Sequence, residues 1–243
     1  MKSFPLITAH TGCMDTPTNS LLSIETGISY GADIIEDDIH VTRDGILVLS
    51  HDDTVRLENG TESRISGMTF NELRDGVSTL IPTLEQALEL VRNAGKIMNL
   101  DLKTDLCIAP VSDLVERLGL HDQVFLTGCE YESARKAQEH NPRLFKLLNA
   151  DVRIFKTLSY TDAIRKTCDH ARSAGCLGLN MPYQLVQPPL LEIAADYSLP
   201  VYIWTVNEEG QIKRFAEMGV RSITTKNVAA AARVKREVTG IGL

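Results

Sequence analysis

Apolar runs and polar turns alternate along this chain in a pattern that predicts strands alternating with helices. Short runs rich in Ile, Leu and Val predict strands, and longer stretches that follow helix-start residues such as Pro82-Thr83 predict helices. The predicted strands are 6–10, 32–41, 96–103, 123–128, 143–148, 176–181, 200–206 and 221–225. The predicted helices are 20–30, 84–93, 110–119, 131–140, 159–174, 187–197, 208–218 and 227–238.

Eight strands that alternate with helices indicate a parallel sheet closed into a (β/α)8 TIM barrel. The chain has 243 residues, close to the length of about 250 that such a barrel needs. No linker or low-complexity segment interrupts the pattern, so we expect residues 1–243 to form one domain.

One apolar run, at residues 46–52, does not fit the alternation. The spacer Thr42-Arg43-Asp44-Gly45 is too short for a parallel crossover, which needs a dozen residues or more. We therefore expect 46–52 to fold back as an antiparallel arm after the second strand, which places His51 near the end of that strand. Residues 53–80 are polar and predict loops, with a turn at 58–60 and a short helix near 69–74.

The second predicted strand carries acidic residues among apolar ones. Side chains alternate on a strand, so Glu36, Asp38 and His40 share one face with Ile34. An exposed edge strand with solvated acids is one interpretation. Two carboxylates on a buried face would repel each other, and a cation held between Glu36 and Asp38 removes that conflict. Oxygen-only ligation favours Mg²⁺ or Ca²⁺ over zinc.

Composition and charge narrow the classes of function. The formal net charge of −7 argues against a nucleic-acid-binding surface, so local cations must attract any anionic substrate. Five scattered cysteines without a CxxC motif are typical of reduced thiols in a cytoplasmic protein. The N-terminus lacks the apolar run of a signal peptide, and no segment has the length of a membrane span. We expect a cytoplasmic protein without stable membrane association.

In TIM barrels the working residues lie at the carboxyl ends of the strands. A single histidine there is usually a core or loop residue, Asp101 and Lys103 alone could form a structural ion pair, and Trp204 alone could be core packing. Three acids, two imidazoles and a lysine at one end of one barrel favour a catalytic site instead, because the acids without a cation would be strongly destabilising. The polar candidates at these ends are His10, Glu36, Asp38, His51, Asp101, Lys103 and Trp204.

Several motifs follow one another from Leu6 to about Thr225, at 10–12, 17–20, 31–38, 42–45, 51–52, 81–85, 99–103 and 204–207. In their order and spacing they resemble the glycerophosphodiester phosphodiesterases. The resemblance implies a (β/α)8 barrel, one divalent cation, and hydrolysis of a small phosphodiester to an alcohol and glycerol 3-phosphate. It implies His10 and His51 as the catalytic pair, Glu36, Asp38 and Asp101 as metal ligands, and Lys103, Trp204 and Thr11 as substrate-binding residues.

Some positions depart from the pattern of the family. Thr11 stands where the family usually has Arg, and Thr18 where it usually has Glu. Loss of the Arg removes a bidentate phosphate clamp that Thr cannot replace. Two explanations stay open: Arg43 or Lys226 supplies the missing charge, or the natural substrate carries a group that Thr11 and Thr18 accommodate. The other departures are Asp101 where Glu is common, Asp37 at a usually uncharged position, and Lys226 after Thr225.

The resulting hypothesis is hydrolysis of glycerophosphodiesters by acid–base catalysis between two histidines. One histidine removes a proton from the attacking hydroxyl, and the other protonates the departing alkoxide. His51 is the better candidate for the acid, because it lies next to the carboxylate of Asp52. One alternative is a phosphodiesterase that acts on a non-glycerol head group or a lysolipid. An alternative of another class is a non-catalytic barrel that binds a ligand, and the sequence leaves the oligomeric state open.

Overall fold

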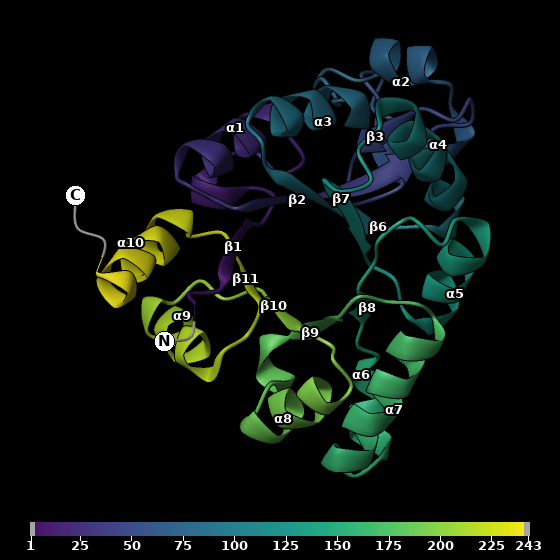
Figure 1. Cartoon of the computed structure of the whole chain (residues 1–243). Coiled ribbons are helices and arrows are strands. Elements are labelled where there is room, and N and C mark those ends of the chain that lie inside the picture. The colour runs from purple at the N-terminus through teal and green to yellow at the C-terminus, as the bar shows by residue number, and fades with distance from the viewer. Residues whose placement is uncertain (1–2, 241–243) are drawn as a thin grey trace.

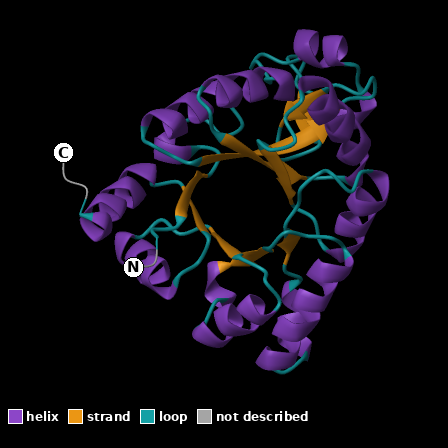
Figure 2. Cartoon of the chain, in the orientation of Figure 1, coloured by secondary structure: helices purple, strands orange, loops and turns teal. Residues whose placement is uncertain are grey.

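A ring of eight parallel strands with helices outside it forms the body of the protein (Figures 1 and 2). The structure is a computed structural model, and it describes residues 3–240. The strands of the ring are β1 (Leu6–Ala9), β2 (Ile34–Val41), β6 (Ile97–Leu102), β7 (Val124–Thr127), β8 (Leu148–Asn149), β9 (Leu179–Pro182), β10 (Val201–Trp204) and β11 (Ser222–Thr225). The predicted (β/α)8 TIM barrel is confirmed.

Helices follow the strands and cover the outside of the ring. The α-helices are α1 (Leu21–Ser29), α2 (Phe70–Gly76), α3 (Leu84–Asn93), α4 (Ile108–Leu118), α5 (Tyr131–His140), α6 (Val152–Thr157), α7 (Tyr160–Ser173), α8 (Pro188–Asp196), α9 (Glu209–Met218) and α10 (Val228–Thr239). Short 3-10 helices are η1 (Cys13–Asp15), η2 (Ile65–Gly67), η3 (Asp105–Cys107) and η4 (Tyr183–Leu185). Within residues 3–240, no helix is long and apolar enough to span a bilayer.

Neighbouring strands run in the order β7-β6-β2-β1-β11-β10-β9-β8, so the first strand joins the last. The two ends of this order meet through backbone hydrogen bonds. Leu126 donates its N–H to the Phe145 carbonyl at 2.9 Å, and Leu147 donates to the Leu126 carbonyl at 2.9 Å. These bonds close the ring between β7 and the segment that leads into β8.

The predicted antiparallel arm is β3 (Leu47–Leu49), which pairs with the end of β2. The chain after it forms a short hairpin of β4 (Thr54–Arg56) and β5 (Glu62–Arg64), where the sequence predicted only loops and a turn. Val48, Ile65 and Leu73 form a small apolar cluster under this insertion, separate from the main core. The insertion thereby holds the arm against the barrel and fixes the position of the residues that follow β3.

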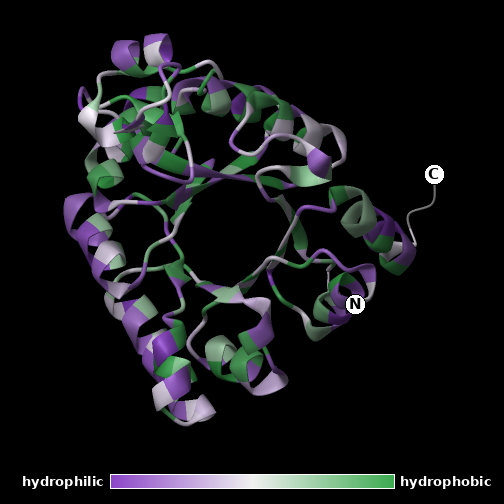
Figure 3. Ribbon diagram, turned by 180° about the vertical axis from the view of Figure 1, so that it is seen from behind, coloured by the Kyte–Doolittle hydropathy of each residue, from purple (hydrophilic) through white to green (hydrophobic). Residues whose placement is uncertain are grey.

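Local chemistry explains where the helices begin and how closely they pack. The side-chain hydroxyl of Ser20 accepts the Ser23 N–H and begins α1, and Thr83 with Gln86 forms a capping box that begins α3. A Cβ at Gly27 would lie 2.7 Å from the Ala9 side chain, so this glycine lets α1 approach the barrel. Figure 3 shows the apolar residues gathered on the strands and on the helix faces toward them.

The strands of the second half differ most from the prediction. The strand expected at 143–148 is reduced to Leu148–Asn149, and the strand expected at 176–181 begins only at Leu179. Helix α6 was not predicted, although Asp151 caps it by accepting the Arg153 N–H. The apolar run at 143–148 pairs with β7 through isolated bonds instead of a continuous ladder, because the chain there crosses the closing point of the barrel.

Candidate active site

A cavity of about 480 Å³ opens at the carboxyl ends of the strands. Seven of the eight residues predicted for the site line it, and Thr11 is the exception. The lining residues are His10, Glu36, Asp38, His51, Asn99, Asp101, Leu102, Lys103, Thr127, Gly128, Asn149, Asn180, Trp204 and Thr224. The barrel thus brings together residues that are up to 214 positions apart in the chain, from His10 to Thr224, as expected for a TIM-barrel site.

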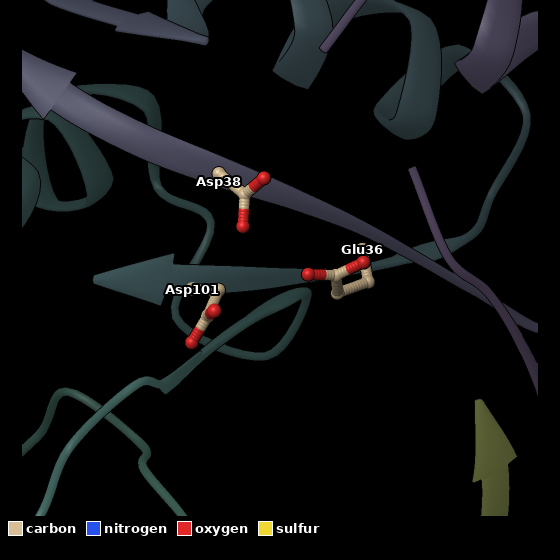
Figure 4. Close-up of side chains that lie close together, drawn as sticks. All are labelled: Glu36, Asp38 and Asp101. Carbon is tan, nitrogen blue, oxygen red and sulfur yellow. The ribbon is translucent and has the colours of Figure 1, made fainter. Parts of the chain in front are cut away.

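Three carboxylates converge on one side of this cavity (Figure 4). The parallel register places Asp38 of β2 directly beside Asp101 of β6, and Glu36 lies two residues earlier on the same face of β2. One oxygen from each of the three lies within 4.8 Å of the others. Burial, followed by the charges of Asp101 and Asp38, raises the pKa of Glu36 well above its usual range. The three carboxylates can therefore be ionised at the same time only if positive charge lies nearby.

Lys103 supplies part of that charge. Its Nζ lies 2.5 Å from Asp101 Oδ2 and 2.8 Å from Asp38 Oδ1. Burial by itself would lower the pKa of Lys103, but the two carboxylates outweigh it and the pKa is raised. One ammonium cannot neutralise three carboxylates, and Lys103 makes no hydrogen bond to Glu36 among the described residues.

The donor set fits a divalent cation. Asp101 Oδ1 is buried and has no hydrogen-bond partner among the described residues, so it has a free lone pair at the cluster. Carboxylate oxygens at this spacing suit a hard ion such as Mg²⁺ or Ca²⁺, and no sulfur or imidazole belongs to the cluster. Glu36, Asp38 and Asp101 would be the residues that hold the ion.

The two predicted histidines lie at the mouth of the same cavity. His10 follows β1, and its Nδ1 is 2.9 Å from the Thr11 carbonyl and 3.7 Å from Glu36. Burial lowers the pKa of His10, the Thr11 carbonyl opposes this shift, and the charge of Lys226 adds to it. His51 stands on the loop after β3, with its Nδ1 2.8 Å from Asp52 Oδ1. Its side chain is 66% exposed, so it is free to approach a bound substrate from solvent.

Thr11 lies behind the carboxylates and does not line the cavity. Its N–H donates to Glu36 Oε2 at 3.1 Å, and its hydroxyl accepts the Asn19 N–H at 2.6 Å. Asn19 in turn donates to Asp38 Oδ2 at 3.2 Å and accepts the Asp38 N–H at 3.2 Å. Thr11 and Asn19 together fix two of the three carboxylates. Direct contact between Thr11 and substrate stays a prediction.

The structure separates the two basic residues considered as substitutes for the missing Arg. Arg43 donates to the Gly67 carbonyl at 2.7 Å and to Glu72 at 2.8 Å, so it belongs to the insertion. Lys226 is exposed and close enough to His10 for its charge to act on the imidazole. Lys226 is therefore the better placed of the two cations.

Trp204 and the remaining lining residues complete the wall. Trp204 ends β10 and is 37% exposed, so it flanks the opening and is not a buried core residue. Reasoning from the sequence missed the neutral polar residues of the wall, which are Asn99, Thr127, Asn149, Asn180 and Thr224. The available signal was the position of four of them at or beside the ends of predicted strands, whereas Asn99 lies on the same strand face as Asp101.

A known family matches residues 10–230, nearly the whole chain: the glycerophosphoryl diester phosphodiesterase family. This chain belongs to that family. It is 24% identical over 236 residues to the glycerophosphodiester phosphodiesterase of Caldanaerobacter subterraneus subsp. tengcongensis, covering 90% of this chain and 93% of that protein. It is 23% identical over 252 residues to lysophospholipase D GDPD1 of Homo sapiens, covering 88% of this chain and 80% of that protein.

Solved structures show the same fold. The glycerophosphodiester phosphodiesterase of Thermotoga maritima matches with a TM-score of 0.78 and 18% identity, over 96% of this chain and all of that one. A phosphodiesterase of Oleispira antarctica, solved with the product sn-glycerol-3-phosphate, matches with a TM-score of 0.80 and 19% identity, over 95% and 96% of the two chains. Membership of the family assigns hydrolysis of glycerophosphodiesters as the class of reaction.

Proposed function

We propose that this member of the family hydrolyses glycerophosphodiesters to an alcohol and sn-glycerol 3-phosphate, with one divalent cation and with His10 and His51 as the acid–base pair. The observation that carries the proposal is one cavity lined by three converging carboxylates and two histidines. A bound cation would supply charge stabilisation for the phosphoryl oxygens in the transition state. Glu36, Asp38 and Asp101 would hold it, and Lys103 adds a second positive charge beside it.

The two histidines have different surroundings, which supports different roles. Burial favours the neutral form of His10, and a neutral imidazole can take the proton of the attacking hydroxyl. His51 is exposed at the mouth of the cavity and hydrogen-bonded to Asp52, and this position suits it to donate a proton to the departing alkoxide. The proton gained by His10 and the proton lost by His51 balance, and exchange with solvent restores both.

The test is release of sn-glycerol 3-phosphate from glycerophosphocholine by protein stripped with a chelator and then given Mg²⁺ or Ca²⁺. We expect turnover to disappear on stripping and return with metal, and the melting temperature to rise with metal because the ion binds the folded state. Asp101→Asn should weaken both responses. Asp105→Asn is the matched control, because Asp105 pairs with Lys136 outside the cavity.

Two outcomes would count against the proposal. Full turnover in excess chelator would remove the cation from the reaction. Metal binding without turnover on any phosphodiester would instead support the non-catalytic barrel.

A further inference from the structure

Two asparagines of the cavity wall have no role in the proposed reaction. Asn149 ends β8 and Asn180 lies in β9, and the parallel register places them side by side. Asn180 is buried, and both line the cavity that holds the carboxylates. We call Asn149 and Asn180 the amide pair.

Hydrogen bonds fix which way each amide points. The Gly128 N–H lies 3.0 Å from Asn149 Oδ1, and a backbone N–H can only donate, so this atom must be the oxygen. Asn180 Nδ2 donates to the same oxygen at 3.0 Å. Within residues 3–240, no protein group hydrogen-bonds Asn149 Nδ2 or Asn180 Oδ1. The pair therefore presents one fixed donor and one fixed acceptor to the cavity.

The amide pair is attached to the carboxylate cluster through Gly128. The backbone of Gly128 is so close to Asp101 that a Cβ on it would lie 2.5 Å from Asp101 Oδ1. Asn149 Oδ1 accepts the N–H of the same glycine. A substrate whose phosphate is at the carboxylate cluster would thus place an attached group of a few atoms next to the amide pair.

The rest of the wall carries few large apolar side chains that could pack along a hydrocarbon chain. Leu102 and Trp204 are the large apolar residues among those that line the cavity, and Trp204 is at its opening. A buried amide that loses its hydrogen-bond partner costs about 1–3 kcal/mol, so an alkyl group against the pair is unfavourable. A hydroxyl both donates and accepts, and two neighbouring hydroxyls match a fixed donor beside a fixed acceptor.

We propose that Asn149 and Asn180 bind the free hydroxyls of the glycerol moiety and thereby select deacylated glycerophosphodiesters over lysophospholipids. The inference rests on the proposed function, because it assigns the specificity of the same site. In a lysophospholipid one of these hydroxyls carries an acyl chain, which removes a donor and places hydrocarbon against the pair. Sites that hydrogen-bond a substrate hydroxyl discriminate strongly against analogues that lack it.

The test compares three substrates with the metal-loaded protein. They are glycerophosphocholine, 1-hexanoyl-lysophosphatidylcholine below its micelle concentration, and bis(p-nitrophenyl) phosphate, which has no hydroxyl. For the wild type we expect kcat/KM to be at least about 100-fold higher for glycerophosphocholine than for the hexanoyl lipid. In Asn180→Leu, which is nearly isosteric, the ratio of glycerophosphocholine to bis(p-nitrophenyl) phosphate turnover should fall by about 10- to 100-fold.

Asn141→Leu is the matched control. Asn141 also makes a side-chain hydrogen bond, to Ser112 at 2.8 Å, but lies outside the cavity, so the substrate ratio should not change. If Asn180→Leu does not fold, Asn180→Ala is measured by the same ratio. Equal losses on glycerophosphocholine and bis(p-nitrophenyl) phosphate, or a wild type that prefers the hexanoyl lipid, would overturn the inference. Failure of the wild type on all three substrates would instead refute the proposed function.

Discussion

Gly128 offers a way to displace one proposed metal ligand without altering its chemistry. Its φ is +72°, and a Cβ would lie 2.4 Å from the Leu102 carbonyl oxygen, 2.5 Å from Asp101 Oδ1 and 2.7 Å from the Leu102 N, whereas ordinary contact begins at 3.4 Å. Two of these three atoms belong to the backbone of β6, which is held on both sides by β2 and β7, so the chain at residue 128 has to shift as well as the side chain of Asp101. We expect Gly128→Ala to move that carboxylate by about 1 Å, since atoms in a packed interior cannot overlap.

The size of the effect follows from the tolerance of a metal site. Ligand distances vary by only about 0.2 Å around their usual values, so a shift of ~1 Å removes Asp101 as a ligand or forces the site to reorganise. Changes to the residues that orient a ligand typically cost about 10- to 100-fold in metal affinity. We therefore expect the dissociation constant for Mg²⁺ to rise by about that factor in Gly128→Ala, with a correspondingly smaller rise in melting temperature at a given metal concentration.

A control variant separates crowding from backbone strain. Gly119 ends α4 with φ +65°, and a Cβ there would meet nothing within 4 Å. Alanine at either position bears a left-handed penalty of about 1–2 kcal/mol, but only Gly128→Ala crowds Asp101. Calorimetric titration with Mg²⁺ and melting curves of both variants measure the difference. Wild-type affinity in Gly128→Ala, or an equal loss in Gly119→Ala, would show that Gly128 does not position Asp101.

Two further predictions concern the histidines and a buried lysine. His10→Ala and His51→Ala should each lower kcat by roughly 10²–10⁴-fold, with melting temperatures near wild type. The double variant should lose less activity than the product of the two single losses, because the pair acts as a unit. Near-normal turnover in a single variant would exclude that histidine from the acid–base pair. Burial lowers the pKa of Lys146, whose Nζ is bonded only to Gln138 among the described residues, at 2.6 Å. Between that lowered pKa and 10.5 the unfolded chain binds more protons, so stability should rise with pH across this window. Lys146→Met should be more stable by about 1–3 kcal/mol at pH 7 and lose this advantage toward pH 10.5, as urea unfolding at several pH values would show; a constant difference would contradict the expectation.

Two parts of the site could be predicted from the sequence, because they depend on charged residues and on the alternation of side chains along a strand. Glu36 and Asp38 share a face because the strand period is two, and this rule needs no tertiary contact. The position of His51 followed from the four-residue spacer at 42–45, which allows only a turn back onto the same strand. Both features depend on neighbours in the chain, and the structure confirms both arrangements.

The amide pair could not be predicted, because its geometry depends on residues far apart in the chain. Asn149 is oriented by Gly128 and joined to Asn180, and these contacts span 21 and 31 positions. A neutral amide at a strand end gives no charge signal of its own. The segment 143–148 added a second difficulty, since it resembles a strand but crosses the closing point of the barrel with few ladder bonds.

Thr11 and Lys226, which depart from the family pattern, both act on groups of the site, and these interactions bear on how the chain manages without the usual arginine. The Thr11 N–H donates to Glu36, and the Thr11 hydroxyl accepts the N–H of Asn19, which itself donates to Asp38. A threonine at this position therefore supports the carboxylates from behind. A buried arginine would lose the hydroxyl contact that positions Asn19. Lys226 brings positive charge to the His10 side of the cavity, where burial already favours a neutral imidazole. We therefore propose that Lys103 and Lys226 attract the phosphate in place of the missing Arg, and that position 11 orients the carboxylate cluster.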